Sequence, residues 1–250
     1  MGRAGALVAV LVTLLSCNAV KEKRQDCPCI LSVQMKELPA YPAVLFVNGS
    51  PAGTAQRDSV LSLWVDGGLA ALAAVAGALP SDKLEIRIPY GLQAPPLYAW
   101  RDTVDCTGET ALARVHLRKQ YCALDIRIKG ILAPGGSVSP RMLSVAVRGS
   151  VNGYSLADGQ PLEGAFRCLL PGSGVCRLPR QRAGDPLWLD IVLEDRVLRS
   201  FPLGTYLESA GYDWYAPDLE DRTLEVDISL TRIRFQCALW SITQELEIVI

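Results

Sequence analysis

The stretch LDIRIK, residues 124–129, alternates apolar and charged side chains along its whole length. Successive side chains of a β-strand point to opposite faces, so this alternation predicts a strand with one buried and one exposed face. The same period of two recurs in LEIRI at 84–88 and over 143–147, 187–193 and 224–231. Turn signals that contain glycine or proline separate these runs. Short alternating runs divided by frequent turns predict an all-β protein built from β-sandwiches.

Two runs depart from this simple pattern. The run GLAALAAVA, residues 68–76, has high helix propensity, but it is apolar all round and lies between strand-like runs. A helix and a strand with a loop are therefore both open there. The alternation over 224–231 slips at Arg232, after which Ile233 and Phe235 continue it in the other phase. We expect a bulge or a turn at this point, because either one would reset the buried face.

The N-terminus has the pattern of a secretory signal. Arg3 supplies one positive charge, and residues 4–15 form an almost wholly apolar run. A run of this length is too short for a membrane-spanning helix, which needs about 20 residues. A basic start followed by a short apolar run is typical of a signal peptide, which we assign to residues 1–16.

The end of this run predicts a lipid anchor. Leu14-Leu15-Ser16-Cys17 resembles a bacterial lipobox, in which the signal is cut before a cysteine that receives a lipid such as palmitate. Small Ser16 suits a cleavage pocket, and the thiolate of Cys17 is the nucleophile that takes the lipid. Two acyl chains hold a protein stably on a membrane. We therefore expect a lipoprotein with Cys17 as the lipidated residue and 17–28 as the lipid tether and linker. An ordinary secretory signal with an incidental cysteine is the alternative.

Composition excludes several classes of function. The 250 residues carry a formal net charge of −1, so the chain has no basic excess for nucleic acid. Its single histidine, His116, lies in a strand-like context without a nucleophile motif beside it. We find no nucleotide-binding fingerprint, and the acidic cluster at 213–221 lacks the spacing of a calcium loop. The sequence therefore predicts no catalytic residues, no cofactor and no metal, and a protein that is not an enzyme.

The cysteines allow one specific pairing. Cys168 and Cys176 flank the turn signal PGSG at 171–174, so they could face each other across a hairpin as a disulfide. Export makes such a bond possible. Cys27-Pro28-Cys29 is not a Cys-x-x-Cys redox motif, and the chain offers few ligands for zinc. Seven cysteines follow Cys17, so at least one thiol stays unpaired.

The domain organisation follows from length and pattern. We expect an N-terminal β-sandwich over 29–122 and a C-terminal β-sandwich over 123–250. Each range has the size of an ordinary domain.

A set of ordered motifs resembles a known family. The motifs follow the lipobox in this order: Asp26-Cys27-Pro28, Ile88-Pro89-Tyr90-Gly91, Tyr98-Ala99-Trp100, the run 147–154 (VRGSVNGY), Phe201-Pro202-Leu203-Gly204, and an alternating strand after Trp240. Their order and spacing resemble the fimbrillin-associated anchor family of Bacteroidales, the FimB/Mfa type, over nearly the whole chain. The matched positions are structural landmarks, except Cys17, which the resemblance marks as the lipid-bearing residue.

The resemblance implies fold, location and partner. It implies two tandem transthyretin-like β-sandwich domains on a lipid anchor in the cell outer membrane, exposed at the surface. It implies a role in cell adhesion as an anchor or accessory subunit of a short fimbrium, with a fimbrial structural subunit as partner. Strand pairing at a sheet edge would hold that subunit. The family has no catalytic residues to transfer.

Two alternatives stay open beside this interpretation. Four aromatic side chains at 206–215 either close a sandwich end or bind a ligand, so a surface lipoprotein that binds a glycan or other small ligand is the second hypothesis. Lys21, Lys23 and Arg24 follow Cys17, where surface-directed lipoproteins of such bacteria often carry acidic residues. A body that faces the periplasm is therefore the alternative to surface exposure.

Overall fold

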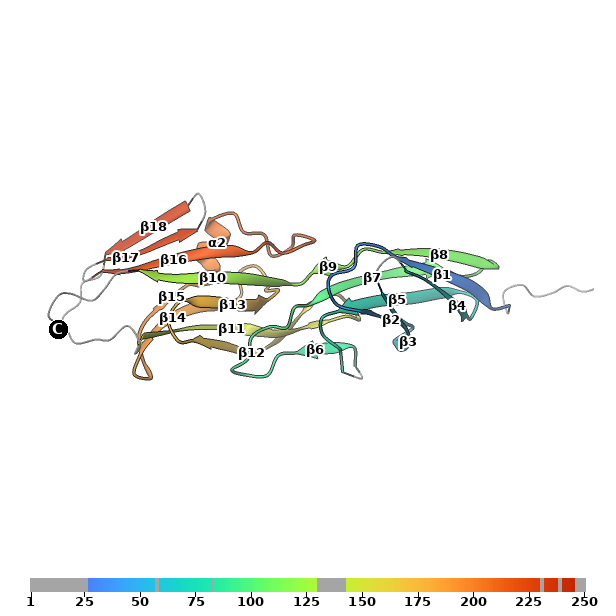
Figure 1. Ribbon diagram of the computed structural model, residues 1–250, viewed down its shortest axis with the longest axis horizontal. Coiled ribbons are helices and arrows are strands. Elements are labelled where there is room, and N and C mark those ends of the chain that lie inside the picture. The colour runs from blue at the N-terminus through green and yellow to red at the C-terminus, as the bar shows by residue number, and fades with distance from the viewer. Residues whose placement is uncertain are drawn as a thin grey trace, which may run out of the picture.

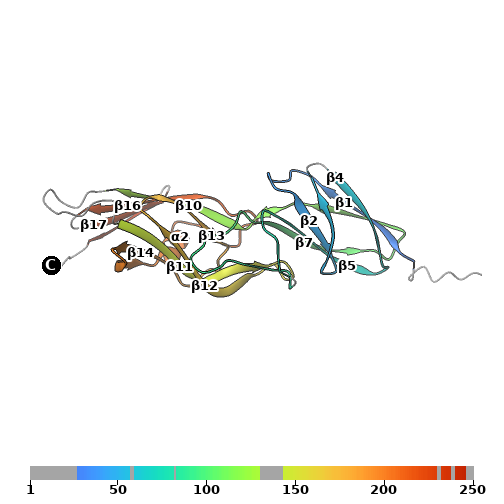
Figure 2. The ribbon, with the colours of Figure 1, turned by 60° about the horizontal axis from the view of Figure 1, so that its bottom comes forward.

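The protein is described here by a computed structural model, which covers residues 27–56, 59–81, 83–129, 143–229, 232–237 and 240–245. Within these residues the chain forms strands and one short helix, α2 (Leu203–Ser209), so the all-β prediction is confirmed. The strands form four sheets, which pack as two facing pairs placed end to end in a long molecule (Figure 1). A view turned by 60° shows the same elongated arrangement (Figure 2). The predicted signal peptide and Cys17 lie outside the described residues.

The first sheet pair contains a sheet of three strands and a sheet of five. The smaller sheet has the order β4 (Ser59–Val65), β1 (Cys29–Met35), β8 (Thr110–Val115). The larger sheet has the order β3 (Ser50–Ala55), β2 (Ala43–Val47), β5 (Leu69–Ala76), β7 (Tyr98–Asp105), β9 (Arg118–Lys119).

Alternation along β1 explains why these two sheets face each other. Leu31, Val33 and Met35 are fully buried, while the residues between them are partly exposed. The buried face of β1 meets the inner faces of β2 and β5 in one apolar cluster. Burial of apolar surface is the main free energy that holds the two sheets together.

The second sheet pair contains two larger sheets. One sheet has the order β12 (Pro161–Leu170), β11 (Leu143–Ser155), β14 (Leu187–Leu193), β15 (Arg196–Phe201), and β6 (Glu85–Arg87) also pairs with β11. The facing sheet has the order β13 (Gly174–Pro179), β10 (Tyr121–Lys129), β16 (Arg222–Ser229), β17 (Arg232–Cys237), β18 (Trp240–Glu245).

The stretch 124–129 forms part of β10 with the predicted faces. Leu124 and Ile126 are fully buried in the core of the second pair, and Arg127 points to solvent and pairs with Asp125 at 2.7 Å. The helix α2 packs its buried face on the same core and contacts β14. The expected break at Arg232 is a change of strand, because β16 ends at Ser229, β17 begins at Arg232, and the two strands pair antiparallel.

One short segment of the first half of the chain belongs to the second sheet pair. β6 pairs antiparallel with the end of β11, so that Arg87 lies opposite Gly153. A side chain at Gly153 would place its Cβ only 2.3 Å from the carbonyl oxygen of Ile86. Gly77 has a φ of +85°, and a Cβ there would meet the carbonyl of Pro96. Glycine at these two positions therefore allows the β6 segment to leave the first pair and lie against the second.

The insertion of β6 explains the apolar run at 68–76, which forms the strand β5. Leu72 and Ala74 face the core of the first sheet pair. Ala73 and Val75, on the opposite face, pack with residues of β6 and β11 in a second cluster. A strand covered on both faces carries no polar alternation, which is why its sequence also suits a buried helix.

A single residue connects β9 of the first sheet pair with β10 of the second. β9 ends at Lys119, β10 begins at Tyr121, and Gln120 between them is buried. The predicted boundary between 122 and 123 falls inside β10, and the predicted range 29–122 includes β6 of the second pair. The tandem-domain ranges themselves stay a prediction.

Candidate interaction surfaces

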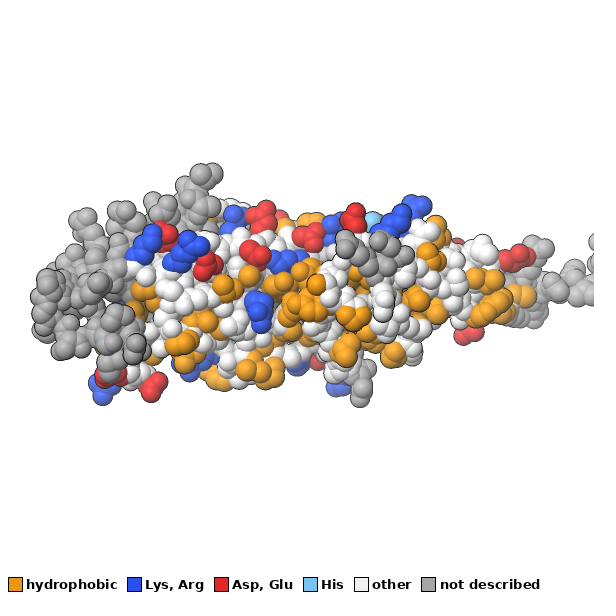
Figure 3. Space-filling view, in the orientation of Figure 1, with side chains coloured by type: hydrophobic (Ala, Val, Ile, Leu, Met, Phe, Trp, Pro, Cys, Tyr) orange, Lys and Arg blue, Asp and Glu red, His pale blue; other side chains and the backbone are white. Residues whose placement is uncertain are grey.

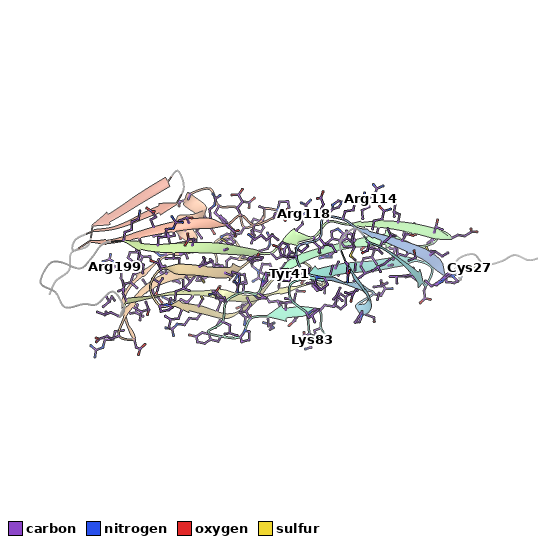
Figure 4. All side chains as sticks on the ribbon, in the orientation of Figure 1. Cys27, Tyr41, Lys83, Arg114, Arg118 and Arg199 are labelled. Carbon is purple, nitrogen blue, oxygen red and sulfur yellow. The ribbon has the colours of Figure 1, made fainter. Side chains whose placement is uncertain are left out.

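The first described residue lies at one end of the molecule. Cys27 is exposed, and Figure 4 labels it at one tip, where β1 begins two residues later. Trp64 lies opposite Ile30 across β4 and β1 and is 72% exposed. Cys27 and the exposed Trp64 therefore belong to the first sheet pair, at the end where β1 begins.

The opposite end presents an unpaired strand edge. β15 ends its sheet, and among the described residues no further strand pairs with its outer side. Val197 and Leu198 in the middle of β15 are 53% and 56% exposed, and Arg196 and Arg199 flank them. Figure 4 labels Arg199 at the end of the molecule far from Cys27. An exposed edge strand with apolar side chains is a template for pairing with another chain.

The C-terminal strand is used within its own sheet. β18 pairs antiparallel with β17 over six residue pairs, from Arg232 opposite Glu245 to Cys237 opposite Trp240. The last five residues of the expected C-terminal strand, 246–250, lie outside the described residues.

Arg180 ties together the segments that meet at the junction of the two sheet pairs. Its Nε donates to Oε1 of Gln120 at 2.7 Å, and its other guanidinium nitrogens donate to the backbone carbonyls of Trp214, Ala216 and Pro217. The residue is 9% exposed. Burial lowers the pKa of Arg180, but a guanidinium stays charged at any physiological pH. A buried cation held by so many acceptors fixes the loop before β16 on the end of β13.

The acidic cluster at 213–221 forms ion pairs at the same junction. Asp218 accepts from the Arg118 guanidinium at 2.8 Å and from the backbone N–H of Lys119. Asp221 accepts from the Lys119 ammonium and from the backbone N–H of Ala123. Acidic and basic side chains gather along this edge of the molecule (Figure 3). The cluster therefore connects β9 of the first pair with the loop before β16 of the second.

The single histidine, considered for catalysis in the sequence, lies at the surface of the described structure. His116 is exposed just after β8. No three side chains of His, Cys, Asp or Glu gather as metal ligands in the described part of the chain. No helix among the described residues has the length and hydrophobicity to cross a bilayer.

The four aromatic residues at 206–215 divide into two groups. Tyr206, Tyr212 and Trp214 are buried in the core, where they close the sandwich end. Tyr215 is 71% exposed and lines a cavity of about 330 Å³ beside Arg180.

A second cavity, of about 280 Å³, lies on the outer face of β11 and β14. Tyr90 and Trp188 line it, and the Arg148 guanidinium lies 5.3 Å from the centre of the Trp188 ring. Arg148 also pairs with the buried Asp190 at 2.8 Å. Aromatic rings beside a fixed charged pair are the groups that a polar organic ligand would use.

The structure brings the predicted cysteine pair together. Cys168 on β12 and Cys176 on β13 are buried and their side chains share a hydrogen bond, which raises the pKa of Cys176. The disulfide between them stays a prediction. A second contact, between Cys29 and Cys106, was absent from the sequence analysis. The available signal was the position of Cys29 two residues before Leu31, which puts both side chains on the same buried face of β1.

The fold was compared with known protein families, sequences and structures. No family model matches the chain, and no curated protein sequence matches it. Solved structures do match it. A candidate adhesin from Bacteroides ovatus has a TM-score of 0.61 at 14% identity, over 88% of this chain and 96% of that one. A candidate polysaccharide-binding protein from Bacteroides thetaiotaomicron has a TM-score of 0.58 at 11% identity, over 88% and 98%.

The fimbrial anchor protein Mfa2 from Porphyromonas gingivalis also matches, with a TM-score of 0.56 at 11% identity, over 86% of this chain and 99% of that one. Each match covers nearly the whole of both chains, so the likeness extends over both sheet pairs. The chain is thus similar in fold to Bacteroidales adhesins and to a fimbrial anchor protein, in agreement with the family resemblance of its motifs.

Proposed function

We propose that this chain is a fimbrial anchor or accessory subunit, held in the outer membrane by a lipid on Cys17 and exposed at the cell surface. It holds or limits a short fimbria by pairing a fimbrial subunit with a strand edge. The single observation that carries the proposal is the placement of two features at opposite ends of a long molecule. Cys27, the first described residue, lies at one end, and the free edge of β15 lies at the far end.

The length of the chain between Cys17 and β1 supports this arrangement. Cys29 lies twelve positions after Cys17, so an extended tether spans about 40 Å at most. The first sheet pair therefore stays close to the membrane, and the second pair points away from it. The fold that the chain shares with adhesins and with a fimbrial anchor protein supports the same role.

The lipid anchor is tested at Cys17. A Cys17→Ala variant in the native host should lose the acyl group on the mature N-terminus and leave the outer-membrane fraction. Mass spectrometry of the N-terminal peptide and fractionation of the envelope measure both effects. A variant that stays in the membrane would overturn the lipid anchor. Protease shaving of intact cells separates surface exposure, in which the body is digested, from a periplasmic body, which is protected.

The subunit contact is tested at the edge of β15. A Val197→Asp/Leu198→Asp variant puts two charges on the exposed strand, so it should reduce co-purification of the fimbrial subunit at least tenfold. Charge on an edge strand opposes pairing with another chain. The matched control is Val60→Asp on β4, because Val60 is 59% exposed but lies in the smaller sheet of the first pair.

Three results of this test are informative. Loss of the subunit with β15 alone supports the proposal. Equal loss of the subunit with both variants would overturn the assignment to β15. Retention of the subunit by both variants would overturn it as well. The melting temperatures of both variants should match the wild type, since all of the changed side chains are exposed.

The second candidate function is binding of a glycan, and the cavity beside Trp188 favours it. One solved structure of similar fold is described as a candidate polysaccharide-binding protein. If this function holds, the purified chain binds an oligosaccharide on an array without any partner protein. Trp188→Ala should then abolish binding, and Tyr41→Ala, which removes a 40% exposed ring elsewhere, should not. An array without signal would remove this candidate.

A further inference from the structure

Cys29 and Cys106 meet in the core of the first sheet pair. Cys29 is the first residue of β1 in the three-stranded sheet, and Cys106 follows β7 of the facing sheet. Both are fully buried in the same apolar cluster, where the neighbouring Cys29 side chain helps to raise the pKa of Cys106. The two thiols therefore lie close together between the sheets.

Backbone contacts on both sides fix this approach. The N–H of Cys106 donates to the carbonyl of Gly68 at 2.7 Å, which holds Cys106 against the start of β5. The N–H of Ile30 donates to the carbonyl of Glu109 at 2.9 Å, which holds the start of β1 against the same turn. The turn that carries Cys106 thus passes from one sheet to the other directly beside Cys29. The proximity is a property of the fold rather than of one side-chain rotamer.

The second sheet pair repeats the arrangement. Cys168 lies on β12 in one sheet, and Cys176 lies on β13 in the facing sheet. Both face the shared core, and their side chains are in hydrogen-bond contact. Each sheet pair therefore holds one pair of touching thiols, and each pair links its two sheets.

We propose that both contacts become disulfides, Cys29–Cys106 and Cys168–Cys176, so that each sheet pair is closed by one covalent bond. In each step two S–H bonds break and one S–S bond forms. The two electrons and two protons pass to an oxidant of the disulfide class, an oxidised dithiol protein or glutathione disulfide, which is reduced to two thiols. Because the folded cores exclude solvent, the exchange takes place before the sheets close. The inference depends on the proposed function only for export to an oxidising compartment.

The other described cysteines have different surroundings. Cys122 is buried in the second core and shares a hydrogen bond with the Tyr212 side chain. Cys27 is exposed and lies before β1. We expect both of these to stay thiols.

Peptide mapping of the full-length protein tests the proposal. The protein is isolated from its native envelope without reductant, denatured with N-ethylmaleimide and digested with trypsin. We expect the peptide 25–36 linked to the peptide 102–114. The peptide 168–177 contains both Cys168 and Cys176, so it should carry no maleimide and weigh about 2 Da less than its reduced form. The peptide 120–127, with Cys122, should be alkylated.

Some maps would overturn the proposal. Maleimide on Cys106 or on the peptide 168–177 would show that the corresponding pair is reduced. A link between 120–127 and 168–177 would show that Cys122 has taken the place of Cys168 or Cys176. Reduction with dithiothreitol before alkylation is the control, and it should label every cysteine.

Cys27 and Cys29 both lie on the peptide 25–36, so the map alone does not show which of them is bonded. Two variants distinguish them. Cys27→Ser should keep the link to 102–114, and Cys29→Ser should lose it. The opposite result would assign the bond to Cys27. Dithiothreitol should also lower the melting temperature of the wild-type protein by roughly 10 °C.

The proposal is also tested independently of location. The purified chain, refolded from denaturant in a glutathione redox buffer, should form the same two bonds. If they form in the buffer but not in the envelope, the pairing holds and the export step of the proposed function fails. If they form in neither, the pairing itself is overturned.

Discussion

The junction between the two sheet pairs and the two ends of the molecule are built in opposite ways. At the junction, Val75 is fully buried, Arg180 is 9% exposed and Tyr98 packs edge-on against Tyr121 with a hydrogen bond between their hydroxyls. At the ends, Trp64 is 72% exposed and Leu198 is 56% exposed. The junction therefore buries its apolar side chains and gives Arg180, Tyr98 and Tyr121 hydrogen-bond partners, and the ends leave apolar side chains exposed. The difference indicates a packed middle that holds two exposed apolar surfaces apart.

The largest expected effect comes from removing the buried guanidinium. Arg180→Leu leaves Gln120 and several backbone carbonyls without a donor, so we expect a loss of about 4 kcal/mol in the free energy of unfolding. The control is Arg127→Leu, which removes an exposed side chain on β10 that pairs with Asp125, and should cost less than about 1 kcal/mol. Urea denaturation measures both. Equal losses would contradict the contrast between junction and surface.

A pair of glycines with similar backbone angles sharpens the comparison. Gly77 at the junction has a φ of +85°, and Gly49 in the turn between β2 and β3 has a φ of +81°. A Cβ at Gly77 meets the backbone of Pro96, but a Cβ at Gly49 meets nothing within 4 Å.

The two alanine variants should therefore differ in stability. We expect Gly49→Ala to cost about 1 kcal/mol and Gly77→Ala about 3 kcal/mol, because both pay for the left-handed backbone and only one adds a clash. Thermal unfolding of the two variants measures the difference. If Gly77→Ala is as stable as Gly49→Ala, the close approach of the β6 segment is not required for the fold.

The smallest expected effect concerns two aspartates. A hydrogen bond from the Ser155 hydroxyl lowers the pKa of Asp158, which lies in a turn beside Arg101 at the junction. Hydrogen bonds from Thr107 lower the pKa of Asp105 at the tether end. A carboxylate whose folded pKa lies below its ordinary value of 3.8 contributes stability above about pH 4 and loses it as the pH falls through the folded pKa.

Acid unfolding of the two amide variants tests this difference. The melting temperature of the wild type should fall between about pH 5 and pH 2. Asp158→Asn should make this fall shallower, and Asp105→Asn should change it less, because Arg101 also lowers the pKa of Asp158 and no cation does so at Asp105. A larger change from Asp105→Asn would contradict the assignment of the stronger interaction to the junction.

The sequence predicted where strands form better than it predicted which strands pair with each other. The alternation at 124–129 identified β10 and its buried face, because period-two patterning depends only on local chain geometry. The alternation at 84–88 likewise indicated a strand, and β6 forms there. It did not indicate that β6 pairs with β11 in the other sheet pair, because alternation specifies a face and not a neighbour.

The same limit applies to the apolar run at 68–76 and to the cysteines. Residues of β6 and β11 cover the second face of β5, so the choice between helix and strand depended on contacts distant in sequence. The pair Cys168 and Cys176 was predictable from a local turn signal. The contact of Cys29 with Cys106 was not, since the two lie 77 positions apart and meet only when the two sheets face each other.

The position of β1 has a mechanical consequence. β1 is the middle strand of its sheet, paired over seven residues with β4 and over six with β8, and it begins two residues after Cys27 at the tip. A pull on Cys27 directed away from the body acts along the axis of β1. Such a load strains the hydrogen bonds on both sides of the strand at once, in shear, rather than opening them one after another like a zipper. The strand order of the first sheet pair is thus suited to a protein held under tension by its N-terminus.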